Sequence, residues 1–192
     1  MKKRNIIEFL LLIILGSLSS LSLPPLNFFM INFFTFSIFF GYLYKKLYIN
    51  SQKKIFFFYG WLFGFGYFLT NLYWITISLT FDNSFSFLIP FALVLIPSLL
   101  AMFYGLISFT FFLFKPKNPL SAFFLFSVLF GIFEFIRGTI LTGFPWNLIV
   151  YSFSDNLDFI SILSLVGTYS LNLISVTLFT VPAIYILRKS KK

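Results

Sequence analysis

The side chains that could do chemistry gather in one stretch, Glu134–Trp146, which reads E-F-I-R-G-T-I-L-T-G-F-P-W. Glu134 and Arg137 lie three residues apart, so on a helix they share one face and can form an ion pair. Pairing matters in lipid, because an unpaired charge at the bilayer centre costs about 2.5–3.5 kcal/mol. After this pair, we expect Gly138, Gly143 and Pro145 to stop any regular helix.

Reactive side chains are otherwise scarce. The 192 residues include no Cys and no His, and only five Asp and Glu. The sequence therefore offers no thiol nucleophile, no disulfide, and no thiolate or imidazole site for a metal. We predict no catalytic residue, no metal and no cofactor in this chain.

The end of the same stretch stays apolar although it cannot be helical. Ile140, Leu141, Phe144 and Trp146 lie among the helix-breaking residues. Lipid offers no hydrogen-bond partners, so irregular backbone at membrane depth must face protein or water. We therefore expect residues 138–157 to form an interfacial or re-entrant loop at a membrane surface.

The elements that must position this loop are membrane helices. Hydrophobic residues make up 59% of the chain and charged residues 10%, and the mean hydropathy is +0.97. Such a composition cannot provide the polar shell of a soluble globule, and it predicts an all-α integral membrane protein. The net charge of +9 does not indicate nucleic acid as a partner, because the basic residues form short clusters between apolar runs. We expect the 33 Phe to pack or to face lipid.

Breaks rich in Pro, Asn and Lys divide the chain into a bundle of about six predicted spans, at residues 6–23, 28–44, 55–79, 89–114, 120–137 and 158–187. The first run contains small residues that suit signal-peptide cleavage, but we expect an uncleaved helix because further spans follow at once. The run 85–114 exceeds a hydrocarbon core of about 30 Å and contains two prolines, so its spanning part should begin near Ile89.

Glycines in the third run form a small-xxx-small pattern. Gly60, Gly64 and Gly66 would let a neighbouring helix approach closely. Local flexibility without a partner helix is the alternative interpretation.

The distribution of charge predicts that both termini are cytoplasmic. Of the 14 Lys and Arg, only Arg137 then falls on the outer side, together with Asp82, Asp155 and Asp158. Glu134 and Arg137 lie near the outer exit of the fifth span in this arrangement. An ion pair that merely caps the helix at the interface is the alternative role for these two residues.

Four segments carry a resemblance to a known family. They are L-S-L-P-P-L-N at 21–27, G-W-L-F-G-F-G-Y-F at 60–68 with L-Y-W-I at 72–75, E-F-I-R-G-T-I-L-T-G-F-P-W-N-L-I-V-Y-S at 134–152, and G-T-Y-S-L-N at 167–172. They resemble the membrane domain of bacterial apolipoprotein N-acyltransferases along essentially the whole chain. The resemblance implies a multi-pass protein of the bacterial inner membrane. Its partners would be membrane phospholipid and the lipoprotein whose N-terminal diacylglyceryl-cysteine receives a phospholipid acyl chain.

The sequence departs from this family at its far end. Family members continue through a seventh helix into a periplasmic nitrilase-like domain, whose Glu, Lys and Cys perform the transfer through a thioester on the Cys. This chain has no Cys, and its basic tail is expected to stay in the cytoplasm, so we expect it to be inactive alone. It would be half of a split enzyme with a separately encoded nitrilase-like subunit, a decayed or truncated gene product, or a fragment of a longer reading frame.

The resemblance and the loop together suggest a lipid-binding site. Its predicted residues are Glu134, Arg137, Gly143, Phe144, Pro145 and Trp146. The last three would line the periplasmic mouth where acyl chains reach the catalytic domain. Two alternatives stay open: a small multispanning transporter or channel, and a folded remnant without function. Neither an inverted repeat nor a polar stripe along a span supports the transporter.

Overall fold

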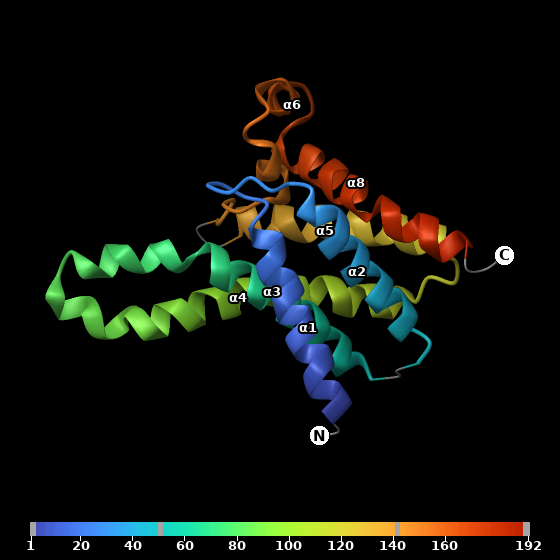
Figure 1. Ribbon diagram of the computed structural model, residues 1–192, viewed down its shortest axis with the longest axis horizontal. Helices are drawn as coiled ribbons and strands as arrows, with labels where there is room; N and C mark the ends of the chain where they lie inside the picture. The colour runs from blue at the N-terminus through green and yellow to red at the C-terminus, as the bar shows by residue number, and fades with distance from the viewer. Residues whose placement is uncertain (1–2, 50–51, 141–142, 190–192) are drawn as a thin grey trace.

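A computed structural model describes residues 3–49, 52–140 and 143–189. Every regular element in this part of the chain is helical (Figure 1), so the all-α prediction is confirmed there. The elements in chain order are α1 (Lys3–Ser20), α2 (Ile31–Lys46), α3 (Lys53–Asn71), η1 (Tyr73–Thr80), η2 (Asn83–Leu88), α4 (Ile89–Phe114), α5 (Pro119–Thr139), η3 (Ile149–Phe153), α6 (Leu157–Ser161), α7 (Leu163–Val166) and α8 (Thr168–Lys189). Leu141 and Thr142, which belong to the predicted loop, lie outside the described residues.

Helices long and apolar enough to cross a membrane are fewer than the predicted six. Within the described residues they are Ser86–Phe114, Pro119–Thr139 and Thr168–Lys189. The pair α3 and η1 would make a fourth span, bent by 47°. The apolar part of α1, at Ile6–Ser20, and the 16-residue helix α2 are shorter. The fold thus has three or four candidate spans, while six spans with both ends in the cytoplasm stay a prediction.

The last apolar run is divided where we expected one helix over 158–187. The long helix α8 begins only at Thr168, and the short helices α6 and α7 precede it. Gly167 separates them with φ of +80°, a conformation that residues with a side chain rarely adopt. This glycine therefore ends α7, and residues 157–166 project from the body of the molecule (Figure 1).

The helical body is held together at glycines where helices touch backbone to backbone. A Cβ atom on Gly60 would lie 2.0 Å from the carbonyl oxygen of Tyr104 on α4, and one on Gly66 would lie 2.1 Å from that of Ile13 on α1. The predicted close approach at the α3 glycines is confirmed, and α3 is the helix that joins α1 to α4.

Aromatic side chains fill the space between α2, α3 and α5. Phe39 stacks on Phe63 with ring centroids 4.2 Å apart, and Phe36 meets Phe130 edge to face at 5.4 Å. All four rings are fully buried. Such aromatic pairs contribute about 0.5–1.5 kcal/mol each beyond the area they bury, so many of the Phe residues are core residues.

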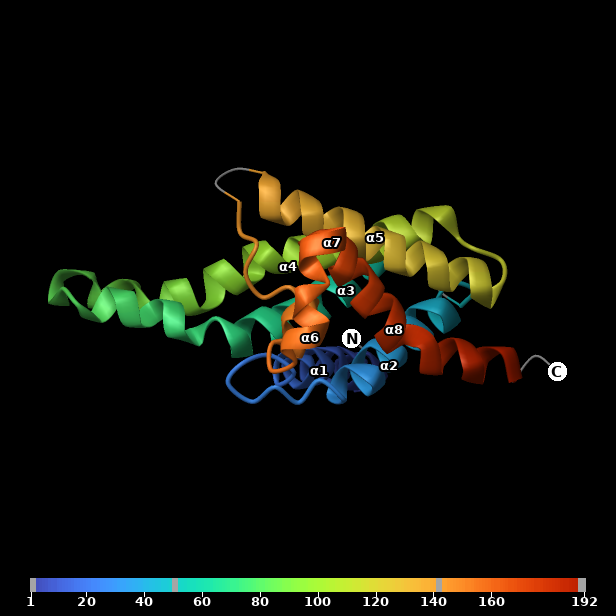
Figure 2. The ribbon, with the colours of Figure 1, turned by 90° about the horizontal axis from the view of Figure 1, so that it is seen from above.

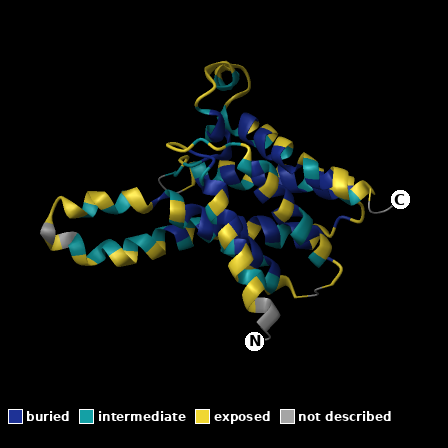
Figure 3. Cartoon of the chain, in the orientation of Figure 1, coloured by how far each residue is buried: buried dark blue, intermediate teal, exposed yellow. Residues whose placement is uncertain are grey.

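A long helical arm extends from the body. It consists of η1, η2 and the first part of α4 (Figure 1), and its surface is largely exposed or half-buried (Figure 3). Phe81 is 87% exposed and Phe91 66%. At the tip, Ser84 N donates a hydrogen bond of 2.9 Å to Asp82 and lowers the pKa of that carboxyl. The helix α4 begins at Ile89, but the candidate membrane span begins at Ser86, so a spanning part that starts near Ile89 stays a prediction.

The glycine contact predicts a difference between two matched substitutions. Gly60→Ala should lower the free energy of unfolding by about 1–3 kcal/mol, because the new methyl group collides with the Tyr104 carbonyl. Gly41→Ala is the control, since a Cβ there meets nothing within 4 Å. Thermal unfolding in detergent measures both variants. Equal melting temperatures would contradict the proposed packing.

Candidate functional site

The predicted ion pair forms at the end of α5. Arg137 Nε donates to Glu134 Oε2 at 2.8 Å, and a second guanidinium nitrogen, Nη2, also contacts this oxygen. The two residues are 2% and 1% exposed. The ring of Phe68 covers the guanidinium at 5.3 Å, which adds a cation–π contact. The pair is therefore enclosed by protein and neutral as a unit.

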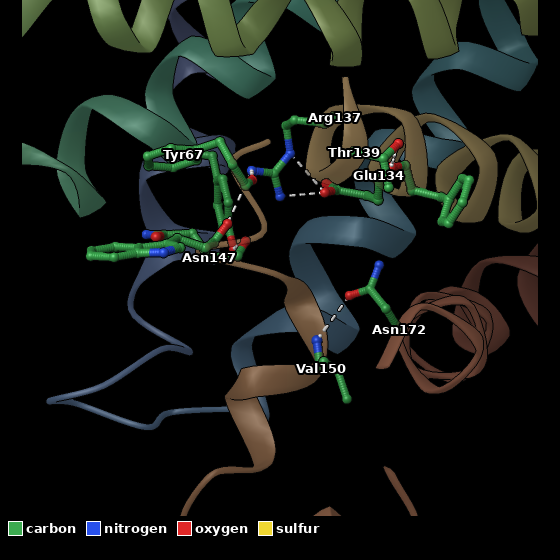
Figure 4. A network of polar contacts seen from close by, with 10 residues as sticks. Tyr67, Glu134, Arg137, Thr139, Asn147, Val150 and Asn172 are labelled. Atoms are coloured by element: carbon green, nitrogen blue, oxygen red, sulfur yellow. Dashed lines mark hydrogen bonds and ion pairs between the residues drawn. The ribbon is translucent and has the colours of Figure 1, made fainter. Parts of the chain in front are cut away.

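The same arginine also holds the loop that follows. Its Nη1 donates to the carbonyl oxygens of Phe144 at 2.6 Å and Trp146 at 3.0 Å. In return, Phe144 N donates to the carbonyl oxygen of Arg137 at 3.1 Å. Figure 4 shows Arg137 between the carboxylate and the loop. The ion pair thus does more than cap a helix, because it supplies hydrogen bonds to backbone that has no helical partner.

Two glycines allow the chain to turn back over the end of α5. Gly143 has φ of +69°, and a Cβ there would lie 2.6 Å from the carbonyl oxygen of Gly138. A Cβ on Gly138 would itself lie 1.8 Å from the hydroxyl of Tyr169 on α8. The positive φ of Gly143 disfavours any larger residue there. The helix α5 continues through Gly138 to Thr139, so the expectation that Gly138 stops the helix is wrong.

The outer surface of the loop is aromatic. Trp146 is 52% exposed and stacks on Trp74 of η1 with ring centroids 5.1 Å apart and an angle of 17°. Phe144 lies 5.8 Å from Trp146. Tyr67 Oη on α3 donates to the carbonyl oxygen of Asn147 at 2.8 Å. The loop is therefore tied to α3 and η1 as well as to α5.

Hollows flank this loop on two sides. The first has a volume of about 510 Å³. Residues that line it include Leu23, Asn71, Trp74, Pro145, Trp146 and Tyr151. The second has a volume of about 470 Å³ and lies toward α4. Residues that line it include Leu100, Phe103, Arg137, Ile140, Gly143 and Phe144. Both volumes lie in the range of sites for small molecules, and their apolar walls suit hydrocarbon.

Tyr151 and Glu134 place polar atoms near the loop. Burial raises the pKa of the Tyr151 phenol, which therefore remains a neutral hydrogen-bond donor. Glu134 Oε1 is a buried acceptor without a hydrogen-bond partner among the described residues. No group of His, Cys, Asp and Glu in the described ranges could hold a metal ion. The site can enclose an apolar chain beside a few polar atoms.

The sequence did not predict the contacts that distant residues of the chain make with the loop and with η3. Asn172 Oδ1 on α8 accepts the backbone N–H of Val150 at 3.0 Å and fixes η3 beneath the loop (Figure 4). Tyr67, Trp74 and Asn172 all lie in the resembling segments, but their roles depend on distances that spacing along one helix does not give. All six predicted site residues are brought together at the end of α5, with Glu134 behind the loop.

The buried pair generates a stability prediction. Arg137→Met should cost about 3–5 kcal/mol, because it leaves Glu134 as an uncompensated buried charge and removes both loop contacts. Arg137→Lys keeps the charge but not the planar fork, and it should cost less, about 1–3 kcal/mol. Chemical unfolding in detergent measures whether Arg137→Met loses more stability than Arg137→Lys. Stability of Arg137→Met equal to that of the parent chain would contradict this role.

Comparison with known proteins assigns a family. The family model described as Apolipoprotein N-acyltransferase N-terminal domain matches residues 15–181. The apolipoprotein N-acyltransferase of Rickettsia prowazekii (strain Madrid E) is 39% identical over 170 residues, which cover 88% of this chain and 33% of that protein. The corresponding enzyme of Allorhizobium ampelinum is 33% identical over 190 residues, which cover 95% of this chain and 36% of that protein.

This chain spans about a third of the length of these curated relatives. The family model nevertheless covers most of the chain, from residue 15 to residue 181. The chain therefore belongs to the family of apolipoprotein N-acyltransferase N-terminal domains.

Proposed function

We propose that this chain is the lipid-binding membrane portion of an apolipoprotein N-acyltransferase. Its role is to hold phospholipid beside the lipoprotein whose diacylglyceryl-cysteine receives the acyl chain. The observation that carries the proposal is the loop Phe144–Trp146, anchored on Arg137 and flanked by two largely apolar hollows. Family membership supports the same role.

The loop has the properties that a lipid-binding surface requires. The indole of Trp146 has an exposed face with its other side against Trp74, and tryptophan favours the boundary between hydrocarbon and headgroup. Pro145 and the hydrogen bonds of Arg137 limit its movement. A rigid apolar surface loses little conformational entropy when an acyl chain binds to it.

The chemical step must come from outside these residues. Acyl transfer through a thioester requires a thiolate, and the 192 residues contain no Cys and no His to activate one. We propose that a nitrilase-like catalytic domain supplies it, and that this chain alone is inactive. The location in this proposal is the bacterial inner membrane, with the loop on the periplasmic side. The basic clusters at the opposite ends of the helices support that orientation.

A chimera tests the proposal. This chain would replace the matched N-terminal part of the Rickettsia prowazekii relative in bacteria depleted of their own enzyme. Mass spectrometry of a lipoprotein N-terminal peptide measures N-acylation. We expect the chimera to restore N-acylation, and Trp146→Ala in the chimera to reduce it about fivefold or more, because an anchoring aromatic residue is lost.

Two controls accompany the chimera. The remainder of the relative without this chain should give no N-acylation. Phe124→Ala truncates an aromatic residue that is 55% exposed on α5, and it should leave N-acylation unchanged. Immunoblots of membranes establish that all variants are inserted at equal levels. If an inserted chimera does not acylate, the proposed function is wrong, and if Trp146→Ala acylates normally, the role of the loop is wrong.

A further inference from the structure

A third hollow lies at the far end of α8, away from the Trp146 loop. It has a volume of about 510 Å³ and is lined by Leu120 at the start of α5 and by Val181, Ile184, Tyr185, Arg188 and Lys189 on α8. Figures 1 and 2 both show the start of α5 beside the end of α8. Arg137 follows Leu120 by 17 residues on the same helix, a distance of about 25 Å at 1.5 Å per residue. This groove is therefore separate from the loop site.

Four of the lining residues form one stripe along α8. Val181, Ile184, Tyr185 and Arg188 follow one another at helical spacing, which places them on one face. Ile184 is 9% exposed and forms the floor, whereas Tyr185 is 70% exposed. Over about 10 Å the stripe changes from aliphatic to phenolic to cationic. A membrane lipid has the same order of acyl chain, interface and headgroup.

Among the described residues, the cations at the end of the stripe have no acidic partner. Arg188 and Lys189 are exposed, and neither takes part in an ion pair within the described part of the chain. Glu8 is the acidic residue on α1 at this end, and Lys46 Nζ already binds it at 2.7 Å. The two charges are therefore available to an external anion.

We propose that this groove binds one anionic phospholipid from the leaflet at the basic end of the molecule. The guanidinium fork of Arg188 suits a phosphate, and Lys189 adds a second positive charge. One acyl chain would lie along Leu120, Val181 and Ile184. A zwitterionic headgroup carries a cation that these two residues repel, so an acidic headgroup is preferred. This lipid is distinct from the proposed acyl donor, which binds at the other end of α5.

Native mass spectrometry of the full chain in detergent tests the proposal. The probes are phosphatidylglycerol and phosphatidylcholine with identical acyl chains. We expect the parent chain to bind one phosphatidylglycerol about tenfold more tightly than phosphatidylcholine. The double variant Arg188→Gln, Lys189→Gln should lose this preference.

A matched control removes two charges elsewhere at the same end. Lys53→Gln with Lys54→Gln acts at the exposed start of α3 and should keep the preference. If both double variants lost the preference for phosphatidylglycerol equally, the preference would reflect general attraction between basic residues and anionic lipid. That result would overturn the proposal. So would a parent chain without any preference, or soluble glycerol phosphate that binds as tightly as the lipid. Melting temperatures without added lipid should match the parent, since the substituted side chains are exposed.

Discussion

A buried arginine must replace its water with fixed acceptors, and this requirement organises the end of α5 and the loop that follows it. The guanidinium of Arg137 has five N–H groups, and four of its hydrogen bonds go to Glu134 and to the carbonyls of Phe144 and Trp146. Those carbonyls belong to backbone without helical partners. Each of the two hydrogen bonds to these carbonyls satisfies the arginine and the loop at once, and neither could be buried in this form without the other.

The helices around the pair fix the loop from two sides. On one side, Tyr67 binds the carbonyl of Asn147 and Trp74 stacks on Trp146. On the other, Asn172 of α8 holds η3 through Val150. The glycine contacts of α3 bring α1 and α4 close enough to keep these partners in place. The result is a rigid aromatic surface between hollows, as a lipid-binding role requires.

Local features of the sequence predicted more than distant ones. The spacing of Glu134 and Arg137 predicted the ion pair that forms at the end of α5. The break at Gly167 was missed because the run 158–187 has no charged residue after Asp158, and hydropathy does not report φ. The stacking on Trp74 joins residues far apart along the chain, and periodicity within single helices holds no information about it.

The central claim is that the loop held by Arg137 binds phospholipid. The most direct measurement is photolabelling of the reconstituted chain with a phospholipid that carries a photoreactive group in its acyl chain, followed by mapping of the labelled peptides. We expect saturable labelling concentrated on residues 143–151 and around Trp74, suppressed by excess unlabelled phospholipid. Labelling spread evenly over the exposed helix faces, with no saturable fraction at the loop, would contradict it.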